Sequence, residues 1–191
     1  AVQKQPIKEL LGLYVKFHQE AEKHPTLNDE ARSWFKKLED GDEEAKRLWL
    51  WFKDESLQEF NTIYQLLGVS FDSLNGEAFY NDKMQHTIAL LAEKNLLSVS
   101  EGAEVVDLSE ESMPPLLIRK SDGATLYATR DLTAAIYRQE NYQFAKALYV
   151  VGQEQTLHFK QVFYTLKKMG FSFAEEMEHI PFGFILKNGK K

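Results

Sequence analysis

Two apolar runs near the C-terminal end of the sequence are separated by a stretch with helical spacing. The first run, "KALYVVG" at residues 146–152, is rich in valine and stops at a glycine; the second is "HIPFGFIL" at residues 179–186. The stretch between them carries apolar residues one helical turn apart: Phe159, Val162, Phe163 and Leu166. Two apolar strands joined by a helix form a βαβ unit, whose strands are parallel and buried. The sequence therefore predicts an α/β fold with a parallel sheet.

The first third of the chain has the apolar spacing of helices throughout. Proline and glycine divide it into three predicted helices, which end near Pro25, Gly41 and Gly68. Thr26 is expected to cap the second helix and Asp42 the third. The aromatic side chains of these helices are expected in the core of a bundle, with a binding surface as the alternative: Trp34, Trp49, Trp51 and Phe52.

The next stretch predicts one strand and one helix. The strand is "VSFDSL", residues 69–74. The helix that follows is expected to have its N-terminal cap near Asn81 or Asp82.

Residues 96–108 and 115–129 change to a period of two and predict a small antiparallel sheet. Each stretch contains a turn signal, "EG" in the first and "SDG" in the second. A short helix is expected over residues 130–141. The chain thus divides into a helical segment (1–68), a strand, helix and antiparallel insertion (69–121), and a segment with the βαβ unit (122–191).

The composition excludes several classes of protein. The net charge is −6 and the pI is about 5.5, which argues against a generally basic nucleic-acid-binding protein. The absence of cysteine excludes disulfides and thiolate metal sites, and it fits a cytoplasmic setting. The five histidines are scattered without metal-ligand spacing. No apolar run approaches the roughly 20 residues that span a bilayer.

The first candidate site is the turn "GQEQTLH" after the first apolar run. In open parallel sheets, ligands bind beyond the carboxyl ends of the strands, and Gly152 lies at such an end. Thr156 is expected to cap the following helix and to leave free N–H groups near Gln155 and His158 for an anion. A solvated loop with a capping role is the alternative.

The second candidate site is "LYATRD", where a strand is expected to give way to a helix. Asp131 beside Tyr127 could bind a guanidinium through paired, charge-assisted hydrogen bonds. Its alternative role is to compensate the dipole in the first turn of the helix. Arg130 could pair with an acid or a phosphate, or lie free on the surface.

Long stretches of this sequence resemble bacterial-type arginyl-tRNA synthetases. "DGATLYATRDLTAAIYR", "LYVVGQEQTLHFKQVFYTLKKMGF" and "HIPFGFILKNGKK" are similar to the second half of their catalytic domain, and "GEAFYNDKM" to the segment before it. The resemblance covers essentially the whole chain. It implies an internal fragment of a partial Rossmann-like, class I catalytic domain, with parallel strands, a helical segment and a small antiparallel insertion.

The resemblance also implies roles for individual residues. Tyr127 and Asp131 match the residues that hold the guanidinium of substrate arginine, and Gln155 matches the contact to the α-amino and carboxylate end. Gly152, Glu154 and His158 match the ATP side of the pocket, where they line the adenosine site. No catalytic residue and no bound metal site are expected in this stretch.

The resemblance implies an arginine–tRNA ligase that uses ATP, with Mg²⁺ in the full-length enzyme, and tRNA-Arg as partner. The sequence lacks the family's HIGH-type motif, and it stops at "GKK", just short of the KMSK-type loop. The chain alone is therefore expected to be inactive. The alternatives are another adenine-nucleotide-binding α/β protein, or a helical interaction module whose aromatic side chains are exposed.

Overall fold

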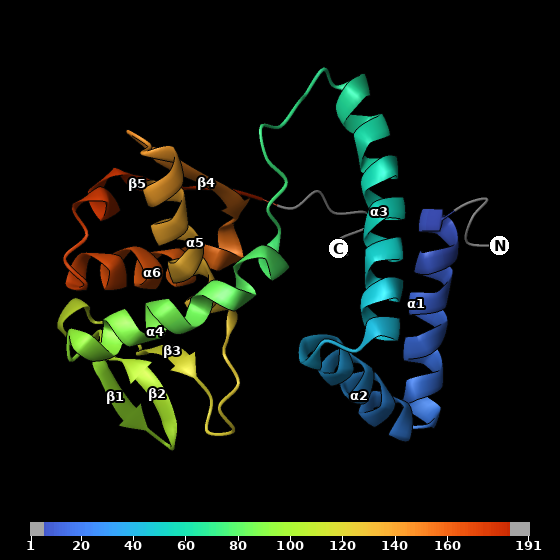
Figure 1. Ribbon diagram of the computed structural model, residues 1–191, viewed down its shortest axis with the longest axis horizontal. Helices are drawn as coiled ribbons and strands as arrows, with labels where there is room; N and C mark the ends of the chain where they lie inside the picture. Colours follow the sequence, from blue (N-terminus) through green and yellow to red (C-terminus); the bar gives the residue numbers. More distant parts are fainter. Residues whose placement is uncertain (1–5, 184–191) are drawn as a thin grey trace. The chain divides into compact units, whose positions relative to one another are not determined.

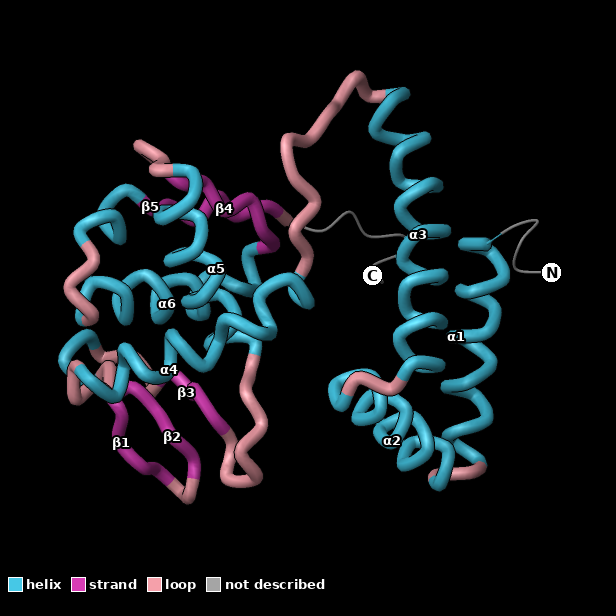
Figure 2. The backbone as a smooth tube through the Cα atoms, in the orientation of Figure 1, coloured by secondary structure: helices cyan, strands magenta, loops and turns pink. Residues whose placement is uncertain are grey.

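The computed structural model describes residues 6–183, apart from the side chain of Glu39 (Figures 1 and 2). The chain divides into two compact units, Ala1–Leu74 and Asn75–Lys191. The first is helical, and the second contains both β-sheets. Within residues 6–183, none of the helices combines the length and apolar character needed to cross a membrane.

Three helices make up the first unit, as the sequence predicts: α1 (Pro6–Lys23), α2 (Thr26–Asp40) and α3 (Glu43–Leu66). The cap predicted for α3 is confirmed, because the Asp42 carboxylate accepts hydrogen bonds from the backbone N–H groups of Glu44 and Ala45. The cap predicted for α2 is wrong. Pro25 already has helical backbone angles, so Thr26 lies inside the helix instead of capping it.

The expected aromatic core of this unit is wrong for most of its members. Trp34, Trp49 and Phe52 are 42%, 37% and 36% exposed, and Trp51 is only half-buried. The buried residues that the structure describes in these helices are two alanines, Ala21 and Ala45. Exposed aromatic side chains are the outcome that the interaction-module alternative predicts.

An irregular connection ends the first unit, and two helices begin the second. Residues 69–74 have no regular structure, so the predicted strand is wrong; its apolar side chains Val69, Phe71 and Leu74 lie exposed, without a neighbouring strand. A 3₁₀ helix, η1 (Glu77–Lys83), then leads into α4 (Met84–Glu93). Asn81 and Asp82 lie within η1 and do not cap α4, because the chain is already helical there.

Sheet A is antiparallel, with strands β1 (Leu97–Ser100), β2 (Ala103–Val106) and β3 (Leu116–Arg119) in that order. Glu101 and Gly102 both have positive φ, as a two-residue hairpin turn requires, which confirms the predicted turn. A single bridge between Arg119 and Thr125 replaces the rest of the predicted second hairpin.

Sheet B confirms the βαβ unit but not the expected burial of its strands, because Leu148 and Val150 are 57% and 64% exposed. Strands β4 (Ala147–Gly152) and β5 (Met177–Phe182) pair in parallel and are joined through α6 (Thr156–Lys168) and the short 3₁₀ helices η3 (Gln153–Gln155) and η4 (Ser172–Glu176). The predicted second strand starts two residues later than β5, and its last residues, 184–186, lie outside the described residues.

One apolar core holds the second unit together. It is built around α5 (Tyr127–Tyr142) and α6, with contributions from α4, sheet A and the start of β5. Its fully buried side chains come from every one of these helices and from sheet A: Leu91, Val106, Ile118, Leu132 and Leu166. The core therefore includes residues from both the 69–121 and the 122–191 segments predicted from the sequence. The division of the chain into three segments stays a prediction.

Candidate functional site

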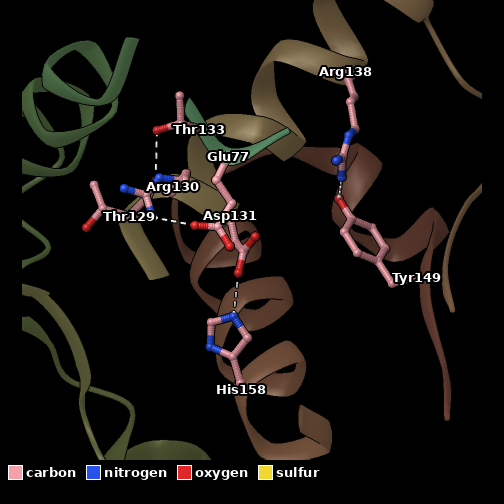
Figure 3. A network of polar contacts seen from close by, with 8 residues as sticks. All are labelled: Glu77, Thr129, Arg130, Asp131, Thr133, Arg138, Tyr149 and His158. Carbon is pink, nitrogen blue, oxygen red and sulfur yellow. Dashed lines mark hydrogen bonds and ion pairs between the residues drawn. The ribbon is translucent and has the colours of Figure 1, made fainter. Parts of the chain in front are cut away.

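The two candidate stretches found in the sequence meet in the structure. Tyr127 and Asp131 lie on α5, and His158 lies in the first turn of α6, which follows the end of β4 (Figure 3). The Nε2 atom of His158 is 2.7 Å from Oδ2 of Asp131. The rings of His158 and Tyr127 are 5.0 Å apart in an edge-on arrangement. Three predicted site residues, from two helices, thus form one cluster.

Asp131 lies deeper in its helix than the sequence suggested. Helix α5 begins at Tyr127 instead of residue 130, which makes Asp131 its fifth residue, and its first turn contains no acidic residue. The alternative role, dipole compensation in the first turn, therefore loses its basis. The Asp131 side chain is 37% exposed, so the carboxylate remains within reach of a ligand.

The His158 imidazole is the buried partner of this pair, with 11% of its side chain exposed. An ionised carboxylate only accepts hydrogen bonds, so the Nε2–H group of His158 is the donor and Asp131 is the acceptor. Phe159 and Tyr127 both contact the imidazole edge-on and limit its rotation. Tyr127 itself is 60% exposed, so one side of the cluster is open.

The other three predicted residues lie in the turn from β4 to α6. Gly152 is buried at the end of β4, opposite Phe182 of β5, and η3 follows at once. The cap of α6 is Gln155, not Thr156; the Thr156 hydroxyl donates to the Gln153 carbonyl instead, at 2.6 Å. Within the described residues, no side chain caps this end of α6. The backbone N–H of Thr156 donates to the Gln153 carbonyl within η3, so this N–H is not free for a ligand.

Glu154 occupies the space that the glycine opens. A Cβ atom built on Gly152 would lie 2.5 Å and 2.7 Å from the two carboxylate oxygens of Glu154. The close approach to Gly152 expected from the sequence is thus made by a side chain of the protein. A carboxylate here suits the hydroxyl groups of a ribose as an acceptor and repels a phosphate.

We expect Gly152→Ala to change the free energy of unfolding by less than about 1 kcal/mol. The backbone angles of Gly152, φ −55° and ψ 145°, suit alanine, and the atoms in the way are the far end of the flexible Glu154 side chain. Gly170→Ala is the matched control, because its φ of +85° strains any Cβ and should cost more. Urea unfolding of the two variants checks this, and equal losses would contradict it.

Arg130 carries two partners that the sequence did not single out. Its Nη1 donates to Oε2 of Glu77 at 3.0 Å (Figure 3), and its Nε donates to Oδ1 of Asn81 at 3.2 Å. Of the roles considered for Arg130, pairing with an acid is therefore the one found. Glu77 and Asn81 are four residues apart, a spacing that could have suggested a shared helical face. The contact ties η1 to α5 directly beside Asp131.

A second guanidinium supports the sheet beneath the site. Nη1 of Arg138 donates to the Tyr149 hydroxyl on β4 at 3.1 Å (Figure 3), and Tyr80 lies on the same guanidinium. Burial raises the pKa of Tyr149, and the nearby Arg138 charge offsets part of that rise. Tyr149 therefore stays a neutral acceptor at physiological pH and links α5 to β4.

The described residues do not by themselves fit a metal ion. No group of three or more His, Asp or Glu side chains in the range 6–183 is arranged to hold one. His158 and Asp131 contact each other, and His179 uses Nε2 for the Val151 carbonyl at 3.0 Å.

Comparisons with known proteins decide the family. A family model described as "tRNA synthetases class I (R), catalytic domain" matches residues 1–191. The chain belongs to the class I arginyl-tRNA synthetases. This confirms the resemblance and the α/β class I fold predicted from the sequence.

Relatives within the arginyl-tRNA synthetase family share most of this sequence. The arginine–tRNA ligase of Exiguobacterium sibiricum is 67% identical over 190 residues, and that of Enterococcus faecalis is 63% identical over 191. Each match covers 100% of this chain and 34% of the relative, so the chain spans about a third of their length. The match to about a third of each relative agrees with the fragment predicted from the sequence.

A solved arginyl-tRNA synthetase structure has the same fold. The enzyme from Plasmodium falciparum matches 86% of this chain and 29% of its own, with a TM-score of 0.75 and 28% sequence identity. A putative arginyl-tRNA synthetase from Campylobacter jejuni, at 20% identity and a TM-score of 0.66, shares the fold.

Proposed function

We propose that this chain supplies one side of the arginine and ATP pocket of an arginine–tRNA ligase. The observation that carries the proposal is the position of Asp131. Its carboxylate is partly exposed, is held at Oδ2 by His158, and lies in a cluster with the exposed Tyr127. Such a carboxylate is suited to a guanidinium, and the chain belongs to a family of arginine enzymes.

The arginine site consists of Tyr127, Asp131 and Gln155. Asp131 receives the guanidinium, whose planar fork of donors matches a carboxylate better than the ammonium of lysine does. Tyr127 offers a hydroxyl acceptor and an aromatic face. Gln155, at the start of α6, can both donate and accept and is assigned to the α-amino and carboxylate end of arginine.

The adenosine site consists of Gly152, Glu154 and His158. Glu154 provides a carboxylate acceptor over the buried Gly152, which suits ribose hydroxyls. Mg²⁺, which the family resemblance implies for the full-length enzyme, has no ligand set in residues 6–183 and enters no step here.

The proposed reaction has two steps. A carboxylate oxygen of arginine attacks the α-phosphate of ATP, the bond to the β-phosphate breaks, and pyrophosphate leaves. A terminal ribose hydroxyl of tRNA-Arg then attacks the arginyl carbonyl, and AMP leaves. The residues of this chain bind and orient the amino acid and the adenosine. The 191-residue sequence contains neither an HIGH-type nor a KMSK-type motif for the phosphates, so we expect the chain alone to be inactive. The cytoplasm is the expected place of this reaction.

A chimera tests the proposal. In this chimera, the chain replaces the matched segment of the Exiguobacterium sibiricum arginine–tRNA ligase, to which it is 67% identical. We expect arginine-dependent ATP–pyrophosphate exchange in the presence of tRNA, with lysine inactive, and no exchange by the isolated chain. Exchange by the isolated chain would refute its expected inactivity. A folded chimera that binds ATP without selecting arginine would support the adenine-nucleotide-binding alternative instead.

A further inference from the structure

The side chain of His158 forms a hydrogen bond with Asp131, a residue of the proposed arginine site. Its Nε2 lies 2.7 Å from Asp131 Oδ2, and this hydrogen bond joins α6 to α5 (Figure 3). We propose that His158 is a positioning residue for arginine, which fixes the Asp131 carboxylate in the orientation that receives the guanidinium. The inference rests on the proposed function, because it requires Asp131 to bind arginine.

The hydrogen bond leaves Asp131 able to bind a ligand. An ionised carboxylate offers about four acceptor sites, and one N–H from His158 uses only one of them. The two side chains differ in burial: 11% of the His158 side chain is exposed, against 37% of the Asp131 side chain. The imidazole is thus the more buried partner of the pair, and the carboxylate is the more accessible one.

The imidazole is itself held in place by its neighbours. Tyr127 contacts the ring at 5.0 Å with an interplanar angle of 62°, and Phe159 contacts it at 5.3 Å with an angle of 64°. A donor with a fixed orientation restricts the rotamers of Asp131 before arginine binds. The conformational entropy that Asp131 loses on binding arginine is therefore smaller. His158 therefore strengthens arginine binding before any substrate contact of its own.

Two variants in the chimera separate the hydrogen bond from the packing. His158→Phe keeps an aromatic ring against Tyr127 and Phe159 but removes the donor. His158→Gln restores an amide N–H at about the reach of Nε2. We expect the first to raise the KM for arginine roughly tenfold, the effect of about 1.4 kcal/mol, and by a larger factor than the KM for ATP, because His158 is also assigned to the adenosine site. The second should recover most of the arginine affinity.

The same experiment distinguishes this inference from the proposed function. If Asp131→Asn raises the arginine KM and His158→Phe does not, the positioning role is refuted and the arginine site stands. If His158→Phe raises the KM for ATP more than that for arginine, His158 belongs to the adenosine site alone. If Asp131→Asn has no effect on arginine, both the site and the positioning role are refuted.

A measurement on the unmodified chain does not depend on how the variants fold. Nitrogen NMR of the His158 imidazole in the 191-residue chain reports which ring nitrogen carries the proton. The positioning role requires a proton on Nε2, pointing to Asp131. A neutral ring with its lone pair on Nε2 would overturn the inference.

Discussion

Asp131→Asn in the chimera is expected to raise the KM for arginine at least roughly 100-fold and to leave the KM for ATP within about twofold. The substitution removes the negative charge and one of the two equivalent acceptors that a guanidinium uses. Hydrogen bonds to charged groups contribute about 1.5–3 kcal/mol each, so losing a paired interaction produces an effect of this size. The asparagine oxygen can still accept from His158, which keeps the change in shape small.

Steady-state pyrophosphate exchange at varied arginine and ATP concentrations measures this effect. Asp72→Asn, at an exposed position in the irregular connection after α3, is the matched control and should leave both KM values unchanged. Unchanged arginine kinetics in the Asp131→Asn chimera would leave Asp131 with a structural role only, as the partner that holds His158 between α5 and α6.

The second large effect is on stability. We expect Leu132→Ala to lower the free energy of unfolding by about 2–5 kcal/mol, because it removes a buried side chain and leaves a cavity. Leu132 is 0% exposed in the core that joins α5 to α4, α6 and sheet A. It follows Asp131 directly, so this core also holds the arginine site in place.

Chemical unfolding of the isolated chain, followed by circular dichroism, measures the loss. Leu157→Ala is the control: Leu157 is 47% exposed on α6, one residue before His158. Its loss should stay below about 1 kcal/mol. Equal losses for the two variants would mean that the core around α5 does not carry the stability of this unit.

The parts of the fold that the sequence predicts well have strong local signals. Two continuous apolar runs around a stretch with helical spacing predict the β4–α6–β5 unit. A two-residue hairpin signal predicts the turn at Glu101 and Gly102. The closeness of Tyr127, Asp131 and His158 is implied only by the resemblance to the synthetase family, because α5 follows antiparallel sheet A whereas α6 follows a strand of parallel sheet B.

The errors arise where packing overrides local pattern. Residues 69–74 pair with no strand within the described residues, so they stay irregular. Trp34 and Trp49 have helical spacing, yet they are 42% and 37% exposed, because helical spacing does not encode which other helix covers a face. Glu77 was missed as the partner of Arg130 because the pair is 53 residues apart in sequence, a separation that no local pattern encodes.

A crystal structure of the chimera with bound arginine tests the central claim most directly. The account predicts that the substrate guanidinium lies within about 3 Å of the Asp131 carboxylate, beside Tyr127, while His158 keeps its hydrogen bond to Oδ2. A guanidinium bound elsewhere in the chimera, with Asp131 contacting only His158, would contradict it.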